Sequence, residues 1–344
     1  MGDQHSVTIK DISKRLKLSV STVSRALRGG TEIKKETREL VQQLAAELDY
    51  RPNPIALSLK EKRSKVIGVI VPEIANNFCS ATIAGIEEVA YSKGYYVTIF
   101  QSHESYEREV INTQLLTARR VDGLIISVSN ETNKYGHLFS LMEKEIPFVM
   151  FDRVCGEIET HKVVVNDYAA AFNATEHLIE QGHTDIAHIT IADFLSITQN
   201  RKKGYIDALT KHNIPVHESS IVHCSFDCAE MDNAIRHLFE LKNRPTAVIA
   251  SVERIAIRCL HVLKEMRLNI PEDVAIIGFS DNPLNSILKP ALSCIRQPTF
   301  EIGKKSAELL LQLIECKSPD KEFQTIELGT TMDILESSRY LRKN

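Results

Sequence analysis

The fold is decided by TIKDISKRL at residues 8–16 and SVSTVSRAL at residues 19–27, with two residues between them. Apolar residues recur at helical spacing in both segments, so each would form a short helix with one apolar face. Ser19 is placed to cap the second helix, because its hydroxyl can accept from an N–H of the first turn. Two short helices across a tight turn predict a helix-turn-helix unit, whose second helix enters the major groove of DNA. A small helical subdomain without DNA binding is the alternative that these residues leave open.

Two features outside these helices favour DNA binding. Residues 1–65 hold 14 Lys and Arg against 8 Asp and Glu, a balance of +6, whereas residues 66–344 hold 28 against 37, a balance of −9. A basic head on an acidic body is typical of a chain that binds phosphate at one end only. A third amphipathic segment, residues 35–48, could cover the first two helices with Leu40, Val41, Leu44, Ala45 and Leu48.

Several motifs together resemble the LacI/GalR family of transcription regulators, and the similarity covers nearly the whole chain. They are VTIKDI at 7–12, VSTVSR at 20–25, ETR at 36–38, YRPNPIA at 50–56 and IGVIVP at 67–72. The resemblance implies a dimeric, ligand-controlled regulator, most simply a repressor of carbohydrate-metabolism genes, that binds a palindromic operator in double-stranded DNA. A signal from a protein partner and the activation of some promoters stay open within this class.

The resemblance also implies which residues of the head contact DNA. Val20 and Ser21 stand at base-reading positions, where valine offers only an apolar contact, for example to a thymine methyl. Arg25 could form a bidentate pair with guanine O6 and N7. Short hydroxyls suited to phosphate contacts, which position but do not specify, come from Thr8, Thr22 and Ser24. For Thr22 and Ser24 the alternative is an ordinary place on the helix surface.

Residues 52–62 are expected to form a hinge helix. Asn53 is a good N-cap and is followed by a proline suited to the first helical position. The segment is so short that it would become helical only when something packs on it. The resemblance implies that this is the twin hinge and the minor groove, with Ala56 at one contact position and Leu59 as a wedge in the central base step. A packed linker helix is the alternative.

From residue 66 onward, strands and helices alternate. Short continuous apolar runs occur at 66–71, 95–100, 123–128, 148–151 and 163–165, and again at 186–191, 221–226, 247–250 and 274–279. With helical stretches between them, they predict parallel sheets covered on both faces. We therefore expect a small all-α helix-turn-helix head and an α/β body with two Rossmann-like subdomains, and the resemblance implies that this body is like that of periplasmic binding proteins. The resemblance adds about three crossings of the chain between the subdomains and a ligand in the cleft between them.

The expected boundaries follow from this pattern together with the resemblance. The head would span 1–51, the hinge 52–62 and the effector-binding and dimerisation body 63–344. Within the body, the N-subdomain would comprise about 63–165 and 292–323, and the C-subdomain about 166–291 and 324–344. The last eight residues carry no leucine heptads, so a homodimer is expected rather than a tetramer.

The resemblance places candidate effector contacts in the cleft. Phe78 and Phe226 would pack on a ligand ring, Cys79 lies beside Phe78, Asp152 would be a cleft carboxylate, and Arg201 would grip hydroxyls or a carboxylate. The alternatives are ordinary core for the two phenylalanines, and a cap or a salt bridge with the neighbouring arginine for Asp152.

Two departures from the family pattern concern the acids of the cleft. In IGFSD at 277–281, Ser280 replaces the usual acid and Asp281 stands one position later. In SVER at 251–254, Val252 and Glu253 replace an Asn-Asp pair. We therefore expect an acid-poor cleft that would favour a sugar acid or sugar phosphate over a neutral sugar.

Other classes of protein are disfavoured. A solute-binding protein for transport could share the body fold, but it would lack the head and would begin with a signal peptide. The polar N-terminus shows no signal peptide, and no apolar run is long enough to span a membrane. No dinucleotide, P-loop or nucleophile-elbow motif suggests an enzyme. Seven scattered cysteines indicate reduced thiols in a cytoplasm. The spacing of Cys224 and Cys228 fits no standard zinc pattern, so neither a metal nor a cofactor is expected.

Overall fold

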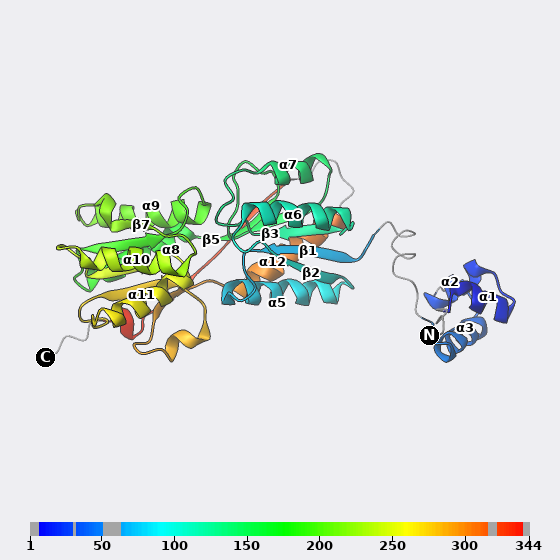
Figure 1. Ribbon diagram of the computed structural model, residues 1–344. Helices are drawn as coiled ribbons and strands as arrows, with labels where there is room; N and C mark the ends of the chain where they lie inside the picture. The colour runs from blue at the N-terminus through cyan, green and yellow to red at the C-terminus, as the bar shows by residue number, and fades with distance from the viewer. Residues whose placement is uncertain (1–6, 30–31, 51–62, 316–321, 340–344) are drawn as a thin grey trace. The chain divides into compact units, whose positions relative to one another are not determined.

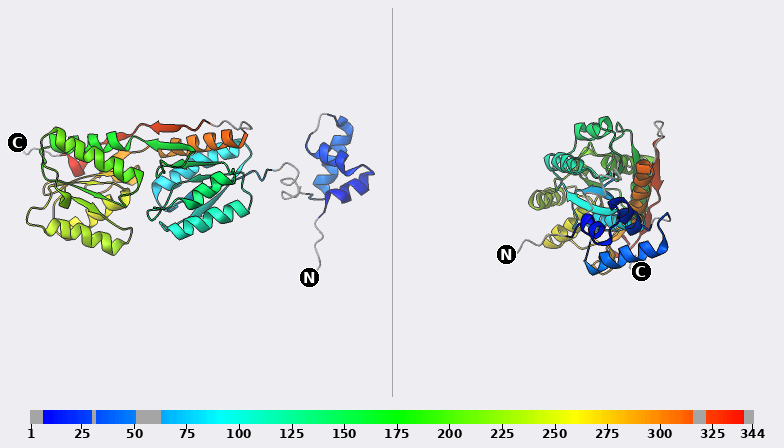
Figure 2. Two further views of the ribbon diagram at one scale, coloured as in Figure 1. Left: turned by 90° about the horizontal axis from the view of Figure 1, so that it is seen from above. Right: turned by 90° about the vertical axis from the view of Figure 1, so that its right-hand side faces the viewer.

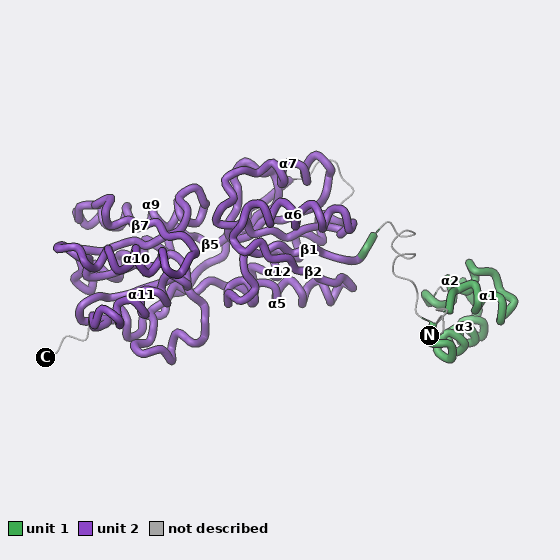
Figure 3. Tube along the Cα trace, viewed as in Figure 1, with its two compact units in different colours: residues 1–64 green, residues 65–344 purple. Residues whose placement is uncertain are grey.

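The computed structural model describes residues 7–29, 32–50, 63–315 and 322–339. The expected hinge helix, with Asn53, Ala56 and Leu59, lies outside the described residues. The chain forms two compact units, residues 1–64 and residues 65–344 (Figure 3). None of the helices in the described ranges is both long and apolar enough to cross a membrane.

The head consists of α1 (Ile9–Leu16), α2 (Val20–Leu27) and α3 (Lys35–Glu47). Lys17 ends α1 with a left-handed backbone (φ 54°), and the Ser19 hydroxyl accepts the Thr22 N–H at 3.1 Å to cap α2. The turn and the cap are therefore those that the sequence predicts. All three helices contribute to one small core, which consists of Ile12, Val23, Ala26, Val41 and Ala45.

The third helix departs from the predicted pattern at one position. Leu40 was expected to cover the first two helices but is 51% exposed, whereas its neighbour Val41 is fully buried. An apolar stripe on a helix facing two other short helices is narrow, and Leu40 lies at its edge rather than within it.

The N-subdomain of the body is built on a six-stranded parallel sheet with the order β11-β5-β4-β3-β1-β2 (Figure 1). Its strands are β1 (Val66–Val71), β2 (Tyr96–Gln101), β3 (Gly123–Ile126), β4 (Phe148–Phe151), β5 (His161–Val165) and β11 (Thr325–Leu328). One face packs on α5 (Asn77–Ser92) and α12 (Thr299–Glu315), and the other on α6 (Tyr106–Ala118) and α7 (Gly136–Glu143). Burial on both faces explains why these strands are continuous apolar runs.

The C-subdomain has a second six-stranded sheet with the order β12-β10-β9-β8-β6-β7, parallel except for β12. Its strands are β6 (Ile186–Thr190), β7 (Ile221–His223), β8 (Ala247–Ala250), β9 (Ala275–Phe279), β10 (Ser293–Arg296) and β12 (Thr331–Asp333). Helices α8 (Asp167–Glu180) and α9 (Ser196–Lys211) cover one face, and α10 (Cys228–Glu240) and α11 (Glu253–Glu265) the other.

The described chain passes between the two sheets after β5, after β10 and after β11. Figure 2 shows the last of these passages, from β11 to β12, along one side of the body. The expected subdomain limits near 292 and 324 are therefore a few residues early, because β10 completes the second sheet before α12 begins and β11 completes the first. Both are four-residue strands, which the sequence pattern alone did not reveal.

Helices α5 and α12 pack with their backbones in contact. A Cβ on Gly85 would lie 2.1 Å from the Phe300 carbonyl oxygen, and one on Gly303 would lie 2.0 Å from the Thr82 carbonyl oxygen. Two glycines, one on each helix, thus permit an approach that any side chain would block. This contact holds α12 on the N-subdomain, although α12 follows the C-subdomain in the chain.

Candidate functional site

The exposed side of α2 carries the predicted base-reading residues. Val20 is 42% exposed although it is apolar, and Ser21 and Arg25 are also exposed. Elsewhere on the same helix, Val23 and Ala26 are fully buried in the head core. An apolar side chain and a guanidinium are therefore exposed on a helix that is anchored in the head core, as direct readout in a major groove requires.

The predicted phosphate-binding hydroxyls have local partners. The Thr8 hydroxyl donates to Asp11 at 2.7 Å, and the Ser19 hydroxyl lies 2.8 Å from those of both Ser21 and Thr22. Thr22 and Ser24 are half-buried. These contacts hold the first turns of α1 and α2, so a phosphate would have to share the hydroxyls with the caps.

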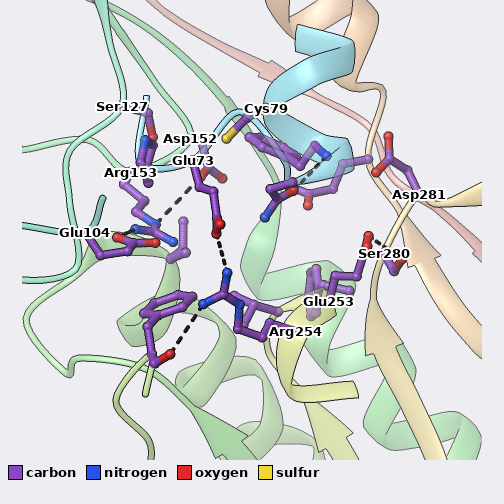
Figure 4. Close-up of a pocket in the computed structure, with 18 of the residues that line it drawn as sticks. Glu73, Cys79, Glu104, Ser127, Asp152, Arg153, Glu253, Arg254, Ser280 and Asp281 are labelled. Atoms are coloured by element: carbon purple, nitrogen blue, oxygen red, sulfur yellow. Dashed lines mark hydrogen bonds and ion pairs between the residues drawn. The ribbon is translucent and has the colours of Figure 1, made fainter. Parts of the chain in front are cut away.

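A pocket lies in the body where the strands of both sheets end (Figure 4). Its volume is about 50 Å³, room for a few water molecules. Residues from both subdomains line it, which is the expected place for a ligand in open α/β sheets, outside the carboxyl ends of the strands. All the predicted effector contacts are brought together here: Phe78, Cys79, Asp152, Arg201, Phe226, Ser280 and Asp281. Their roles as ligand contacts stay predictions.

Arg201 is the most deeply buried of the cleft arginines, at 2% exposed. Its Nε donates to Asp167 at 2.7 Å, its Nη2 lies 2.6 Å from the same carboxylate, and its Nη1 donates to the Ser251 carbonyl. The guanidinium lies 3.7 Å over the Phe279 ring. The two buried groups need each other, because either charge left alone in the interior would be costly.

The other two arginines of the pocket are also paired with carboxylates. Arg153 donates to Glu104 at 2.6 Å, and Arg254 pairs with Glu73. The second pair joins the two subdomains, since Glu73 follows β1 and Arg254 belongs to α11. Both guanidiniums lie over the ring of Phe226, at 5.6 Å for Arg153 and 5.2 Å for Arg254.

The expectation of an acid-poor cleft is wrong. Five carboxylates line the pocket: Glu73, Glu104, Asp152, Glu253 and Asp281. Ser280, which stands where an acid was expected, donates to Glu253 at 2.7 Å. The acid missing from one strand end is thus supplied by the helix of the neighbouring strand-helix unit.

Asp281 connects the two subdomains. It accepts from the Asn77 amide at 3.1 Å and from the Thr299 hydroxyl at 2.6 Å, both of which belong to helices of the N-subdomain. It is thus a structural bridge as well as a predicted ligand contact.

Burial alters the ionisation of several pocket groups. It raises the pKa of Asp152, with an opposing effect of Arg153, and raises the pKa of Asp167 to about 6 despite its pairing with Arg201. Burial also raises the pKa of the Cys79 thiol to about 12, so this cysteine is a packing residue rather than a nucleophile. The described residues contain no group of three His, Cys, Asp or Glu side chains that could hold a metal.

The sequence analysis missed Glu73, Glu104 and Arg254 as pocket residues. A signal was present for the two acids, because each follows a predicted strand within four residues, at the edge where ligands bind. Arg254 lies in the first turn of α11, where its reach across the cleft depends on the tertiary structure.

Comparisons with known proteins agree with this geometry. A model of the bacterial regulatory proteins of the lacI family matches residues 8–53, and a periplasmic binding protein-like domain matches residues 175–338. The probable HTH-type transcriptional regulator EndR of Paenibacillus polymyxa is 35% identical over 92% of this chain and 93% of its own. The chain belongs to the LacI family. It is therefore a DNA-binding transcriptional regulator by descent.

One further relative and one solved structure are similar to nearly the whole chain. The ribose operon repressor of Haemophilus influenzae is 33% identical over 96% of this chain and 98% of its own length. A crystal structure of the lac repressor dimer bound to operator and the anti-inducer ONPF has a TM-score of 0.84 and 23% identity, covering 96% of this chain and 99% of that one. That likeness establishes the shared fold of head and body.

Proposed function

We propose that this LacI-family member represses carbohydrate-metabolism genes from a palindromic operator, as a homodimer controlled by a small carbohydrate-derived ligand in the cleft. The DNA-binding part of the proposal is supported by α2, on which Val20, Ser21 and Arg25 are exposed while Val23 and Ala26 are buried in the head core. The ribose operon repressor of Haemophilus influenzae, to which the chain is similar over nearly its full length, supports the carbohydrate assignment. The protein would act in the cytoplasm, on chromosomal DNA.

Selection of operator sequences tests the DNA half. The purified protein is incubated with random DNA duplexes, and the bound pool is sequenced after several rounds. We expect two inverted half-sites, because a two-fold symmetric dimer places its two heads on a symmetric site. Enrichment of a single half-site, or of no motif, would contradict the proposal.

An exposed apolar surface supports the homodimer. β2 is the edge strand of its sheet, and large apolar side chains are exposed on β2 and on the two helices that flank it in the chain: Tyr91, Tyr96, Ile99, Ile111 and Leu115. Tyr91 and Tyr96 are 72% and 70% exposed, although aromatic residues are normally covered. A second copy of the chain would cover this surface.

Sedimentation measures that association directly. Tyr96→Lys should shift the protein from dimer to monomer at micromolar concentration and weaken operator binding, while its melting profile stays that of a folded body. Met332→Lys, at a side chain 37% exposed on β12, is the matched control and should sediment as the wild type. A Tyr96 variant that stays dimeric would refute this choice of surface.

Ligand control would operate through the cleft. Residues from both subdomains line the pocket, so a ligand bound there would contact both and could favour one arrangement of the two over another. A ligand that prefers one arrangement over the other would shift the population of the two, and with it the spacing of the heads on DNA.

A further inference from the structure

The charges around the pocket are unbalanced. Its lining contains five carboxylates and three guanidiniums, and Asp167, which pairs with Arg201 just behind the lining, adds a sixth acid. Figure 4 shows labelled acids on several sides of the pocket rather than in one cluster. A ligand entering this space therefore meets an excess of negative charge in surroundings of low dielectric constant, where it is only weakly screened.

All three guanidiniums already have acidic partners. Arg153 is bound to Glu104, Arg201 to Asp167 and Arg254 to Glu73. An anionic ligand that replaced a partner in one of these three pairs would leave a carboxylate unpaired. The exception is Nε of Arg153, which has no hydrogen-bond partner among the described residues, but an anion there would lie beside Asp152, whose carboxylate is 4.0 Å from that nitrogen. Leaving a buried charge without its partner is strongly unfavourable, so the lining disfavours a carboxylate or phosphate on the ligand.

Three carboxylates, by contrast, have no cationic group within hydrogen-bonding distance among the described residues. Glu253 accepts from the neutral side chains of Ser280 and Asn282, and Asp281 accepts from those of Asn77 and Thr299.

Of the three carboxylates, Asp152 has the fewest partners. Its side chain is 12% exposed, and its cationic neighbour is Nε of Arg153 at 4.0 Å, which is beyond hydrogen-bonding distance. Within the described ranges its carboxylate accepts no side-chain hydrogen bond. Burial also raises its pKa, against the opposing effects of Arg153 and Arg201.

We propose that the effector is a small hydroxylated amine, an amino sugar in its simplest form, whose ammonium group is bound by Asp152. This inference rests on the proposed ligand control and narrows the ligand class of the same pocket. An ammonium group supplies the missing positive charge and donates charge-assisted hydrogen bonds, which are about twice as strong as neutral ones. The ring hydroxyls would donate to Glu253 and Asp281, and the ring would pack on Phe78 or Phe226.

Calorimetry with matched sugars tests the proposal on the full-length protein. Glucose, galactose and mannose are each compared with their 2-amino, N-acetylated 2-amino and uronic acid derivatives, at about pH 6.5, where a primary amine is mostly protonated. At least one amino sugar should bind about tenfold or more tighter than its parent and its N-acetylated form, because a desolvated charge pair is worth at least that much. The N-acetyl derivative keeps the nitrogen and removes its charge.

Two variants locate the effect. Asp152→Asn keeps the shape and removes the charge, so it should bring the amino sugar and its parent to within about twofold of each other. Asp207→Asn, at an exposed carboxylate on α9 that pairs with Lys203, should leave the preference unchanged. The melting temperature of each variant establishes that it is folded.

The outcomes separate this inference from the proposed function. Tightest binding of a uronic acid or of a parent sugar would overturn the amine inference and leave ligand control intact. Binding by no member of the panel would overturn both the inference and carbohydrate control, while operator selection still decides the DNA half. An amino-sugar preference that persists in Asp152→Asn would overturn the assignment to Asp152.

Discussion

Arg25 is the side chain of α2 best suited to specify a base. It is exposed, as are Val20 and Ser21, and a guanidinium can donate two parallel hydrogen bonds to guanine. Arg25→Ala should weaken binding to the selected operator by about 1–3 kcal/mol and relax the preference at one base position.

The control for this prediction is Arg15→Ala, at an exposed arginine in the last turn of α1. Any loss it causes should be the same for all DNA sequences, because it removes charge without removing a base contact. Titration of both variants against the operator and its single-base mutants measures the difference. Unchanged affinity and unchanged base preference in Arg25→Ala would contradict the role of Arg25 in reading a base.

His188 makes the C-subdomain sensitive to acid. It is fully buried in β6 and stacks on Tyr205 with ring centroids 5.3 Å apart, and within the described residues neither ring nitrogen has a hydrogen-bond partner. Burial lowers its pKa to about 3. The folded state thus keeps the ring neutral while the unfolded state takes up a proton below about pH 6.5, so stability is lost as the pH falls from about 6.5 toward 3.

His188→Phe should remove that dependence. Between pH 7 and pH 5 the wild type should lose about 2 kcal/mol more of its free energy of unfolding than the variant, which has no ring to protonate. Urea unfolding at both pH values measures this difference. Equal losses in the two proteins would show that His188 is already charged or hydrated in the folded state.

At the scale of elements, the contact between α5 and α12 depends on glycine. Alanine at Gly303 would place a methyl group 2.0 Å from the Thr82 carbonyl oxygen, so one helix would have to move. Overpacking of this kind costs about 1–3 kcal/mol, more than the ~1 kcal/mol that alanine gains over glycine as a helix former. Gly303→Ala should therefore destabilise the body in urea unfolding.

Gly136→Ala is the matched control for this helix contact. Gly136 also lies in a helix, α7, but a Cβ there would meet nothing within 4 Å. It should leave stability unchanged or raise it by up to ~1 kcal/mol. If both variants behave alike, the close approach of α5 and α12 is not what stabilises the N-subdomain.

At the scale of the whole body, the Glu73–Arg254 pair joins the subdomains across the cleft. Two backbone N–H groups report on the closed arrangement, since Ala192 N donates to Asn130 Oδ1 at 3.1 Å and Val154 N to Ser196 Oγ at 3.3 Å, each from one subdomain to the other. Arg254→Gln should speed amide exchange at both positions by up to about fivefold, because a pair this exposed is worth at most ~1 kcal/mol.

The control for this prediction is Lys203→Gln, which removes an equally simple ion pair within α9. It should leave exchange at Ala192 and Val154 unchanged. Exchange rates at these two amides that match the wild type in Arg254→Gln would mean that other contacts, such as those of Asp281, keep the cleft closed.

The sequence by itself determined the head and the alternation of strands and helices, whereas the seven candidate residues of the cleft came from the resemblance to the family. Ile12 and Val23 are core, Ser19 is a cap and Lys17 is a helix end for reasons that act within a few residues, namely helical spacing and backbone capping. The carboxyl ends of apolar strands likewise identify one edge of each sheet.

Only the tertiary structure decided which charges meet. Glu73 and Arg254 are 181 residues apart, and Ser280 and Glu253 are 27 apart, so no local pattern shows that they pair. The same holds for the four-residue strands β10 and β11. Each joins its sheet by pairing with a strand that is separate from it in the chain, β9 for β10 and β5 for β11. An ion pair or a short strand is stabilised by its partner, and the partner's position is a property of the fold. For this reason an acid-poor cleft was expected and an acid-rich one is present.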